Sequence, residues 1–463
     1  MTELADIGVV GLGVMGANLA LNLAEHGFRV AVFDHDLARS RQLAQGAFAE
    51  RFIACGTEAE LLAAIQPPRP VLMLVPAGDA TDSAIHTLAQ CASSGDLLID
   101  AGNSDFHDTR RRTSALEAKG LTFLGIGVSG GAEGARNGPA MMAGGSAEIW
   151  DRVAPMLKAI AARHGDEPCA AWLGPDGAGH FVKTVHNGIE YADMQMIAEV
   201  YGVMRDGLGE DAQSVADVFG KWSSGPLDSY LVEITAEVAA AIDVETKLPI
   251  LDVIADRAGQ KGTGRWSVIE AQRLGVVASA MEAAVGARNL SADTFLRQSL
   301  AGKTRSVLAE TLSLEDLHDA LHAGKIIAYA QGFDLLARAS TEYDWSLDLA
   351  SVARVWRAGC IIRSAMLDEI AASFDAAAGT SLLAAPVFRD RLAIVLPSLR
   401  HTVSVAAASG VPVPALANAL SYFDQLSQSR GTANMLQALR DRFGQHGFER
   451  TDRGGTGFHG PWV

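Results

Sequence analysis

The spacing of apolar residues divides the chain near residue 177. Before that point, short apolar runs rich in β-forming residues alternate with helical patterns. We expect strands at ADIGVV, FRVAVFD, PVLMLVP, DLLIDAG, LTFLGIG, AMMAGG and CAAWLG. Because strands that alternate with helices assemble into βαβ units, the pattern predicts an α/β domain with a doubly wound, mainly parallel sheet over residues 1–177.

Beyond residue 177 the apolar residues recur at helical spacing, in segments such as SYLVEITAEVAAAI, GKIIAYAQGFDLLARAS and ALANALSYFDQLS. This predicts a large all-α domain over residues 178–430. We expect its tryptophans to pack between helices, namely Trp222, Trp266, Trp345 and Trp356. Residues 431–463 form a C-terminal tail whose last part is rich in glycine and charge. Such a tail is either a frayed terminus or a docking segment.

One helical segment, HFVKTVHNGIEYADM at residues 180–194, carries an unusual polar row. At 100° per residue, one side of this helix holds Lys183, His186, Asn187 and Glu190. The opposite side is an apolar stripe of Val182, Val185, Ile189 and Met196. The polar row is either a solvated face with pairs at i+3 and i+4, or the wall of a cavity between two domains.

Composition and charge narrow the possible partners. The 463 residues are 49% hydrophobic and 20% charged, as in ordinary globular proteins, and the formal net charge is −16. A nucleic acid or an anionic membrane needs a basic face, so we expect neither as a partner. The four cysteines lie far apart without CxxC spacing, which predicts no zinc site or disulfide and fits a reducing compartment. With no basic leader and no apolar run of about 18 residues, we expect a cytoplasmic protein.

A glycine-rich turn follows the first predicted strand and opens a helical pattern. Its six residues are Gly11, Leu12, Gly13, Val14, Met15 and Gly16. Glycines allow a tight turn there, and the unpaired N–H groups of the helix N-terminus attract a pyrophosphate. A GxGxxG pattern in this context predicts a Rossmann-type dinucleotide-binding domain.

The second strand ends in Asp34, 23 residues beyond Gly11, where an acid can bind the ribose 2′-hydroxyl of NAD. A 2′-phosphate would meet a like charge there, so Asp34, His35, Asp36 and the absence of arginine in this stretch favour NAD over NADP. The alternative is that Asp34 only caps a loop.

The segment VSGGAEGARNGPAMMAGG after the LTFLGIG strand contains too much glycine for a stable helix. We therefore expect a loop in which Ser129, Gly130 and Gly131 present a hydroxyl and backbone amides to a ligand. Asn103, after the DLLIDAG strand, takes a similar position. Lys183 could serve as a base at neutral pH only if burial or a neighbouring cation lowers its pKa.

Taken together, several segments closely resemble the decarboxylating 6-phosphogluconate dehydrogenases of the pentose phosphate pathway. They are GLGVMG, DAGNSDFHDTRRR, GVSGGAEGARNGP, GAGHFVKTVHNGIEYADMQ, AGQKGTGRW and GCIIRS, and the resemblance covers nearly the whole chain. It implies oxidative decarboxylation of 6-phospho-D-gluconate to D-ribulose 5-phosphate and CO2, with reduction of NAD or NADP and without a metal.

The resemblance also implies roles for individual residues. Lys183 would be the general base that later returns a proton, and Glu190 the general acid. The sugar acid would be held by Asn103, Ser129, Gly130, Gly131, His186, Asn187 and Tyr191, and the cofactor also by Val75, Pro76, Ala77 and Asn103. The phosphate contacts would be Lys261 and Arg288. Arg440 and His446 would reach the site from a second subunit, in a homodimer with exchanged tails.

The chain departs from the resemblance around the cofactor. NADP-dependent members typically have Asn-Arg-Thr in place of Asp34, His35 and Asp36, and a lysine in place of Pro76, which again favours NAD. One alternative is another β-hydroxyacid dehydrogenase, such as one acting on 3-hydroxyisobutyrate, but those chains are usually much shorter. Another is a non-catalytic nucleotide-binding protein, which would be expected to lack Lys183 or Glu190.

Overall fold

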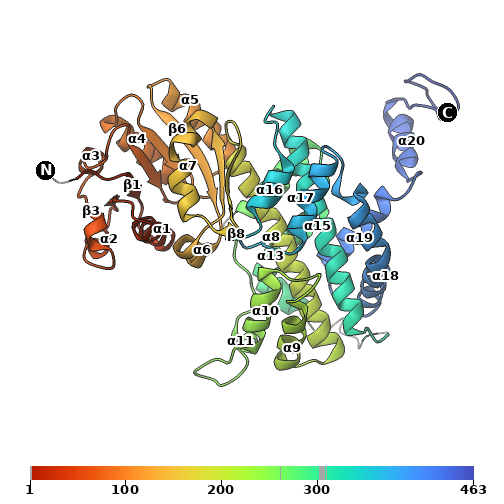
Figure 1. Cartoon of the computed structure of the whole chain (residues 1–463). Coiled ribbons are helices and arrows are strands. Elements are labelled where there is room, and N and C mark those ends of the chain that lie inside the picture. The colour runs from red at the N-terminus through yellow and green to blue at the C-terminus, as the bar shows by residue number, and fades with distance from the viewer. Residues whose placement is uncertain (1–2, 261, 302–307, 309, 463) are drawn as a thin grey trace.

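The computed structural model describes residues 3–260, 262–301, 308 and 310–462. An α/β domain lies at the N-terminal end, and a bundle of long helices follows it (Figure 1). In the same view a last helix and the C-terminal loop project from the far end of the bundle. The predicted fold class, a doubly wound sheet followed by a helical domain and a tail, is therefore confirmed.

The α/β domain is built on one eight-stranded sheet in the order β10-β7-β6-β5-β4-β1-β2-β3. Neighbouring strands are parallel except for the β6 and β7 pair. The strands are β1 Ile7–Val10, β2 Val30–Phe33, β3 Phe52–Ala54, β4 Pro70–Met73, β5 Leu97–Asp100, β6 Thr122–Val128, β7 Met141–Gly145 and β10 Ala170–Gly174. The sequence pattern missed β3 and a small hairpin of β8 Arg163–His164 and β9 Glu167–Pro168, because these segments are too short for a clear period.

Helices cover both faces of the sheet. They are α1 Val14–Glu25, α2 Leu37–Leu43, α3 Glu58–Ala63, α4 Asp79–Cys91, α5 Phe106–Glu117, α6 Gly131–Asn137 and α7 Ala147–Ile160, with a short η1 Ala49–Arg51. Along β4, Leu72 packs into the core on one face, and Val71 and Met73 pack into the core on the other. Burial on both faces explains why the strands read as continuous apolar runs.

Helix α6 corrects one prediction, because we expected this glycine-rich stretch to remain a loop. Gly130 precedes the helix with φ +106°, a conformation that favours glycine. The carbonyl of Ala135 accepts a hydrogen bond of 3.2 Å from the buried side chain of Asn22 on α1. Packing against α1 therefore outweighs the low helix propensity of the segment.

The helical domain is arranged around α8 Ala178–Gly202 and α15 Leu314–Glu342, which pack on each other in its core. The other helices are α9 Ala212–Trp222, α10 Tyr230–Ala240, α11 Ile250–Val253, α12 Thr263–Leu274, α13 Ser279–Ala292, α14 Thr294–Leu300, α16 Leu349–Val355, α17 Met366–Ala376, α18 Pro386–Ala408, α19 Pro414–Leu426 and α20 Ala433–Gly444. Two short turns of helix, η2 Val203–Leu208 and η3 Leu382–Ala384, complete it. Among the described residues, no helix is long and apolar enough to cross a membrane.

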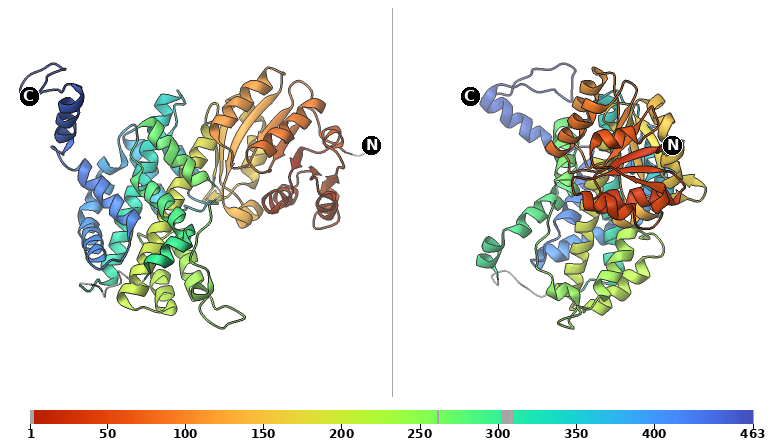
Figure 2. Two further views of the ribbon diagram at one scale, coloured as in Figure 1. Left: turned by 180° about the vertical axis from the view of Figure 1, so that it is seen from behind. Right: turned by 90° about the vertical axis from the view of Figure 1, so that its left-hand side faces the viewer.

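The tail consists of α20 and a loop that folds back on it, and both stand away from the rest of the molecule (Figure 2). Asp441 is fully buried and organises the loop. Its carboxylate accepts hydrogen bonds from the backbone of Gly447 and Gly460 and from the side chains of His459 and Trp462. The tail is thus a folded hook, and the interpretation as a frayed terminus is wrong.

Candidate active site

A cavity of about 1130 Å³ runs along the carboxyl ends of the strands of the α/β domain. The predicted glycine turn lines one part of it. Gly11 has φ +88°. A Cβ on Gly16 would lie only 1.9 Å from the carbonyl oxygen of Gly11, so the turn accepts no side chain there. The N-terminus of α1 therefore opens directly onto the cavity, as a pyrophosphate requires.

Asp34 lies beside this turn at the end of β2. Its Oδ2 accepts a hydrogen bond of 2.6 Å from the amide of Leu12, and its Oδ1 accepts one of 2.8 Å from the amide of Asp36. The carboxylate is therefore fixed between the two loops. His35 also lines the cavity, whereas Asp36 is the N-cap of α2, accepting a hydrogen bond from Ala38.

The stretch of residues 34–36 contains no arginine, but the structure brings one to Asp34 from the following helix. The guanidinium of Arg39, on α2, lines the cavity and lies 3.8 Å from the Asp34 carboxylate and 3.4 Å from that of Asp36. Arg39 is five residues beyond Asp34 in sequence. Only the turn into α2 brings its side chain back to the strand end.

The other predicted cofactor residues, Val75, Pro76, Ala77 and Asn103, also line the cavity. Val128, Thr263 and Trp266 also line the cavity, and sequence reasoning did not identify them as site residues. Trp266 thus does more than pack between helices. The glycine-rich motif AGQKGTGRW was the available signal, because such a segment allows close approach to a ligand.

The polar row of α8 is buried. Lys183 is 6% exposed, His186 and Asn187 are buried, and the Glu190 side chain is 21% exposed. The alternative of a solvated helix face is therefore wrong. The row begins beside Ser129, which follows the cavity-lining Val128 in sequence.

Hydrogen bonds connect these groups into one cluster. Lys183 Nζ donates to Ser129 Oγ at 3.0 Å and lies 3.2 Å from Nδ1 of His186. The other ring nitrogen of His186 lies 3.2 Å from Ser129 Oγ. One Glu190 carboxylate oxygen lies 3.7 Å from His186 Nδ1. The cluster therefore brings an amine and a carboxyl group to the same nitrogen of one imidazole, with Ser129 at the other nitrogen.

Burial changes the proton affinities in this cluster. It lowers the pKa of Lys183 from its ordinary value, and it raises the pKa of Glu190. Burial, together with the nearby Lys183 amine, also holds the pKa of His186 well below its usual range. The neutral amine and the protonated carboxyl are thus both more accessible near neutral pH than in water, as proton transfer requires.

Three glycines explain why α8 can hold Lys183 so deeply. A Cβ on Gly127 of β6 would lie 2.4 Å from the Cβ of Lys183. A Cβ on Gly144 of β7 would lie 2.4 Å from the amide of Gly179, and one on Gly179 would lie 2.3 Å from the carbonyl oxygen of Met142. Helix α8 therefore packs backbone to backbone on the sheet.

The remaining predicted residues differ in where they lie. Tyr191 is buried beside the cluster, and the guanidinium of Arg288 lies over its ring, 3.5 Å from the centroid. Lys261 lies outside the described residues. Arg440 and His446 are exposed on the hook formed by α20 and its loop, which projects from the helical domain, so the single chain does not bring them to the cluster (Figure 1).

Metal-binding residues do not come together in this way. Within residues 3–260, 262–301, 308 and 310–462, no three or more His, Cys, Asp or Glu side chains form a group that could hold a metal ion.

A Rossmann-type domain with an acid at the end of β2, joined to a buried lysine on the first helix of a helical domain, defines the class of nicotinamide-dinucleotide dehydrogenases. Family models agree: the NAD binding domain of 6-phosphogluconate dehydrogenase matches residues 6–174, and the C-terminal domain of 6-phosphogluconate dehydrogenase matches residues 179–462. The chain belongs to the 6-phosphogluconate dehydrogenase family.

Individual relatives extend over the whole chain. Two decarboxylating 6-phosphogluconate dehydrogenases of Bacillus subtilis (strain 168), one NADP(+)-dependent and one NAD(+)-dependent, are each 42% identical to it, with 99% of both chains covered. The solved structure of Plasmodium falciparum 6-phosphogluconate dehydrogenase superposes with a TM-score of 0.94 at 38% identity, covering 99% of this chain and 100% of that one. The resemblance seen in the sequence is confirmed. The family assignment favours 6-phosphogluconate dehydrogenase over the alternative of a 3-hydroxyisobutyrate dehydrogenase.

Proposed function

We propose that this protein converts 6-phospho-D-gluconate to D-ribulose 5-phosphate and CO2 while reducing a nicotinamide dinucleotide. The observation that carries the proposal is the burial of Lys183 within hydrogen-bond reach of Ser129 and His186, next to the dinucleotide cavity. The family assignment supports the same reaction. The residue roles below are part of the proposal.

Oxidation requires a base at the C3 hydroxyl of the sugar acid. When bound, the nicotinamide accepts a hydride from C3. The neutral Lys183 amine takes the hydroxyl proton, so that C3 becomes a ketone. Ser129 and His186 hold the amine in place and share its hydrogen bonds, and burial keeps the amine neutral for a larger fraction of the time.

In the decarboxylation that follows, Lys183 acts as an acid and Glu190 takes part as a second acid. The C3 ketone is β to the carboxylate, so the C1 to C2 bond of the acid breaks as CO2 leaves, and its electrons form an enediol. Protonated Lys183 supplies the proton to the C3 oxygen. Glu190, whose pKa is raised by burial, then donates a proton to the carbon that lost CO2, while the neutral Lys183 amine takes the proton back from the C3 hydroxyl, and this gives the ketose.

Substrate binding completes the assignment. Asn103, Ser129, Gly130, Gly131, His186, Asn187 and Tyr191 would hold the carboxylate and hydroxyl groups. Arg288, held over the Tyr191 ring, is the described cation that we assign to the phosphate, together with Lys261. The guanidinium is well suited because its fork of N–H donors matches phosphate oxygens.

For the cofactor, we propose a preference for NAD. The Asp34 carboxylate is fixed at the strand end where an adenosine ribose binds, and a 2′-phosphate would meet its charge. Arg39 does not reverse this, because its guanidinium is already paired with both Asp34 and Asp36. The kcat/KM values for NAD and NADP test the preference, and equal or better use of NADP would reject it.

We further propose a homodimer in which each hook completes the partner's site. Helix α20 exposes an apolar row that a free monomer would leave in water, with Phe443 76% exposed. The other members of the row are Met435, Leu436 and Leu439. Arg440 and His446 lie on the same hook and would supply the phosphate contacts to the partner.

Subunit mixing tests the exchange directly. A Lys183→Met subunit and an Arg440→Ala/His446→Ala subunit should each be inactive alone. If the hook acts in the partner's site, each mixed dimer has one intact site, so an equal mixture should recover about a quarter of the wild-type activity. No recovery from a mixture shown to exchange subunits would contradict the exchange.

The reaction itself is tested with purified protein, 6-phosphogluconate and either cofactor. Reduced nicotinamide, CO2 and ribulose 5-phosphate should appear in equal amounts. Turnover of 3-hydroxyisobutyrate without turnover of 6-phosphogluconate would overturn the proposed function.

A further inference from the structure

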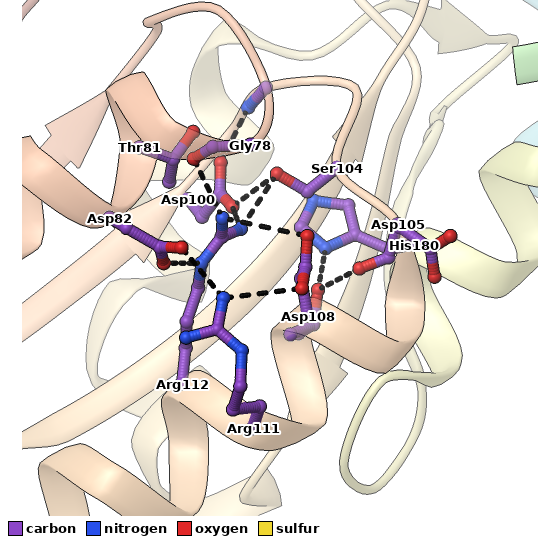
Figure 3. Close-up of polar contacts among 12 residues, drawn as sticks. Gly78, Thr81, Asp82, Asp100, Ser104, Asp105, Asp108, Arg111, Arg112 and His180 are labelled. Atoms are coloured by element: carbon purple, nitrogen blue, oxygen red, sulfur yellow. Dashed lines mark hydrogen bonds and ion pairs between the residues drawn. The ribbon is translucent and has the colours of Figure 1, made fainter. Parts of the chain in front are cut away.

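A buried arginine joins two loops of the dinucleotide cavity. Arg112, on α5, is 2% exposed. Its guanidinium donates to the carbonyl of Gly78 at 3.1 Å, to Ser104 Oγ at 3.1 Å and to the carboxylate of Asp82 at 2.7 Å (Figure 3). Gly78 ends the cavity-lining stretch after β4, and Ser104 belongs to the turn after β5. One side chain thus connects both loops.

Asp100, the last residue of β5, also fixes the turn that follows the strand. One carboxylate oxygen of Asp100 accepts the amide of Gly102 at 3.0 Å, and the other accepts the hydroxyl of Ser104 at 2.6 Å and the Arg112 guanidinium at 3.2 Å. Ala101, Gly102 and Ser104 are buried, whereas Asn103 between them is exposed and lines the cavity. The hydrogen bonds therefore leave one side chain of this turn free to contact a ligand.

A second contact connects this turn to the helix that carries Lys183. The Thr109 hydroxyl, on α5, lies 2.7 Å from Nδ1 of the buried His180, and it donates to the carbonyl of Asp105 at 3.2 Å. His180 lies on α8, one helical turn before Lys183. Its other ring nitrogen has no hydrogen-bond partner within the described residues, and Nδ1 is the ring nitrogen that contacts Thr109.

We propose that Arg112 and the Thr109–His180 pair are positioning residues. They hold the nicotinamide side of the cavity in a fixed position relative to Lys183. Arg112 fixes the two loops that carry Asn103 and Val75–Ala77. The Thr109–His180 pair fixes that assembly to α8. This inference rests on the proposed function, since it assigns the hydride acceptor to the Asn103 part of the cavity and the base to Lys183.

Cofactor binding tests the role of Arg112 without turnover. Arg112→Lys keeps the charge but loses the fork that spans both loops. The affinity for the preferred cofactor should fall about tenfold, whereas the affinity for the same dinucleotide lacking the nicotinamide ring should not change. Arg111→Lys is the matched control, because Arg111 is half-exposed and contacts Asp82 and Asp108 but neither loop. An equal loss of both affinities would show a general effect on the fold and overturn the proposal.

The second test removes only the hydroxyl of Thr109. Thr109→Val should lower kcat by about a hundredfold, as expected for a misplaced reacting pair, with little change in the KM for the cofactor. Thr109→Ser, which keeps the hydroxyl, should restore most of the activity. Equal activity of the Val and Ser variants would overturn the role of the pair. These outcomes differ from failure of the proposed function, in which the unmodified protein itself would not turn over 6-phosphogluconate.

Discussion

The amine of Lys183 lies 3.0 Å from the hydroxyl of Ser129, although 54 residues separate them in the chain. Ser129 follows the last residue of β6, and Lys183 lies in the second turn of α8. The distance therefore depends on how closely α8 packs on the sheet. It also places the Lys183 amine close to Val128, which lines the dinucleotide cavity.

Replacing Lys183 should separate catalysis from binding. Lys183→Met removes the proposed proton-transfer group while filling a similar volume, so kcat should fall by about two to four orders of magnitude. Cofactor binding, measured by calorimetry, should remain normal because Lys183 does not line the part of the cavity around Asp34. A variant with near-normal kcat would contradict the assigned role.

The pH dependence of the rate should reflect the buried amine. Burial lowers the pKa of Lys183, so the fraction of neutral amine rises with pH and saturates below the ordinary lysine range. We expect kcat/KM to rise with pH and to level off below pH 10.5, the ordinary value. Lys183→Arg, which stays protonated, should show no such rise. If kcat/KM instead rose with the pKa of an ordinary lysine, the amine would be exposed to solvent.

Close packing of α8 can be tested at Gly127. A Cβ there would overlap the Cβ of Lys183, which cannot move without shifting the helix. Gly127→Ala should destabilise the protein by about 1–3 kcal/mol and lower kcat. Gly286→Ala, in α13, meets no neighbouring atom within 4 Å and should be neutral or slightly stabilising. Urea unfolding and steady-state kinetics measure both effects.

Acid sensitivity should depend in part on His322. Burial, helped by the charge of Arg391, lowers the pKa of His322 from 6.5 to about 4. The unfolded chain therefore binds this proton at higher pH than the folded chain does, and the associated stability is lost as pH falls from 6.5 to about 4. This difference between the pKa values of the unfolded and folded chains corresponds to a loss of at most about 3 kcal/mol in the free energy of unfolding.

The measurement is the free energy of unfolding at pH 7 and pH 4.5. His322→Gln should lose less stability between the two than the unmodified protein does. His86→Gln, at an exposed position, is the control and should behave like the unmodified protein. An unchanged pH slope in His322→Gln would show that the ring does not contribute.

Asp441 should matter for the hook rather than for the body of the protein. Asp441→Asn places an amide opposite N–H donors, so the loop of residues 447–462 should loosen and become sensitive to protease. If the hook completes the partner's site, the KM for 6-phosphogluconate should rise about tenfold or more, while cofactor KM stays unchanged. Asp452→Asn removes only an exposed pair with Arg450 and should have little effect. Normal KM with a loosened loop would argue against exchange.

The local sequence was sufficient to predict several features of the protein. The glycine turn, the acid at the end of β2 and the polar row on α8 each lie within one segment, and their chemistry follows from residue type and spacing. The alternation of strands and helices likewise predicted a doubly wound sheet, because a strand with two buried faces needs a continuous apolar run. The long motifs identified the family.

Tertiary structure decided what those residues face. The spacing of Lys183 and Glu190 allowed either a solvated face or a cavity, and only the packing of α8 in the folded protein buried them and shifted their pKa values. Folding also brought Arg39 to Asp34, made α6 a helix, and linked Arg112 to two loops. The contact of Arg112 with Gly78 and the formation of helix α6 depend on residues far apart in the chain, and the contact of Arg39 with Asp34 depends on the turn between β2 and α2. Distances and burial across such contacts belong to the packed molecule, so no single segment of the sequence contains them.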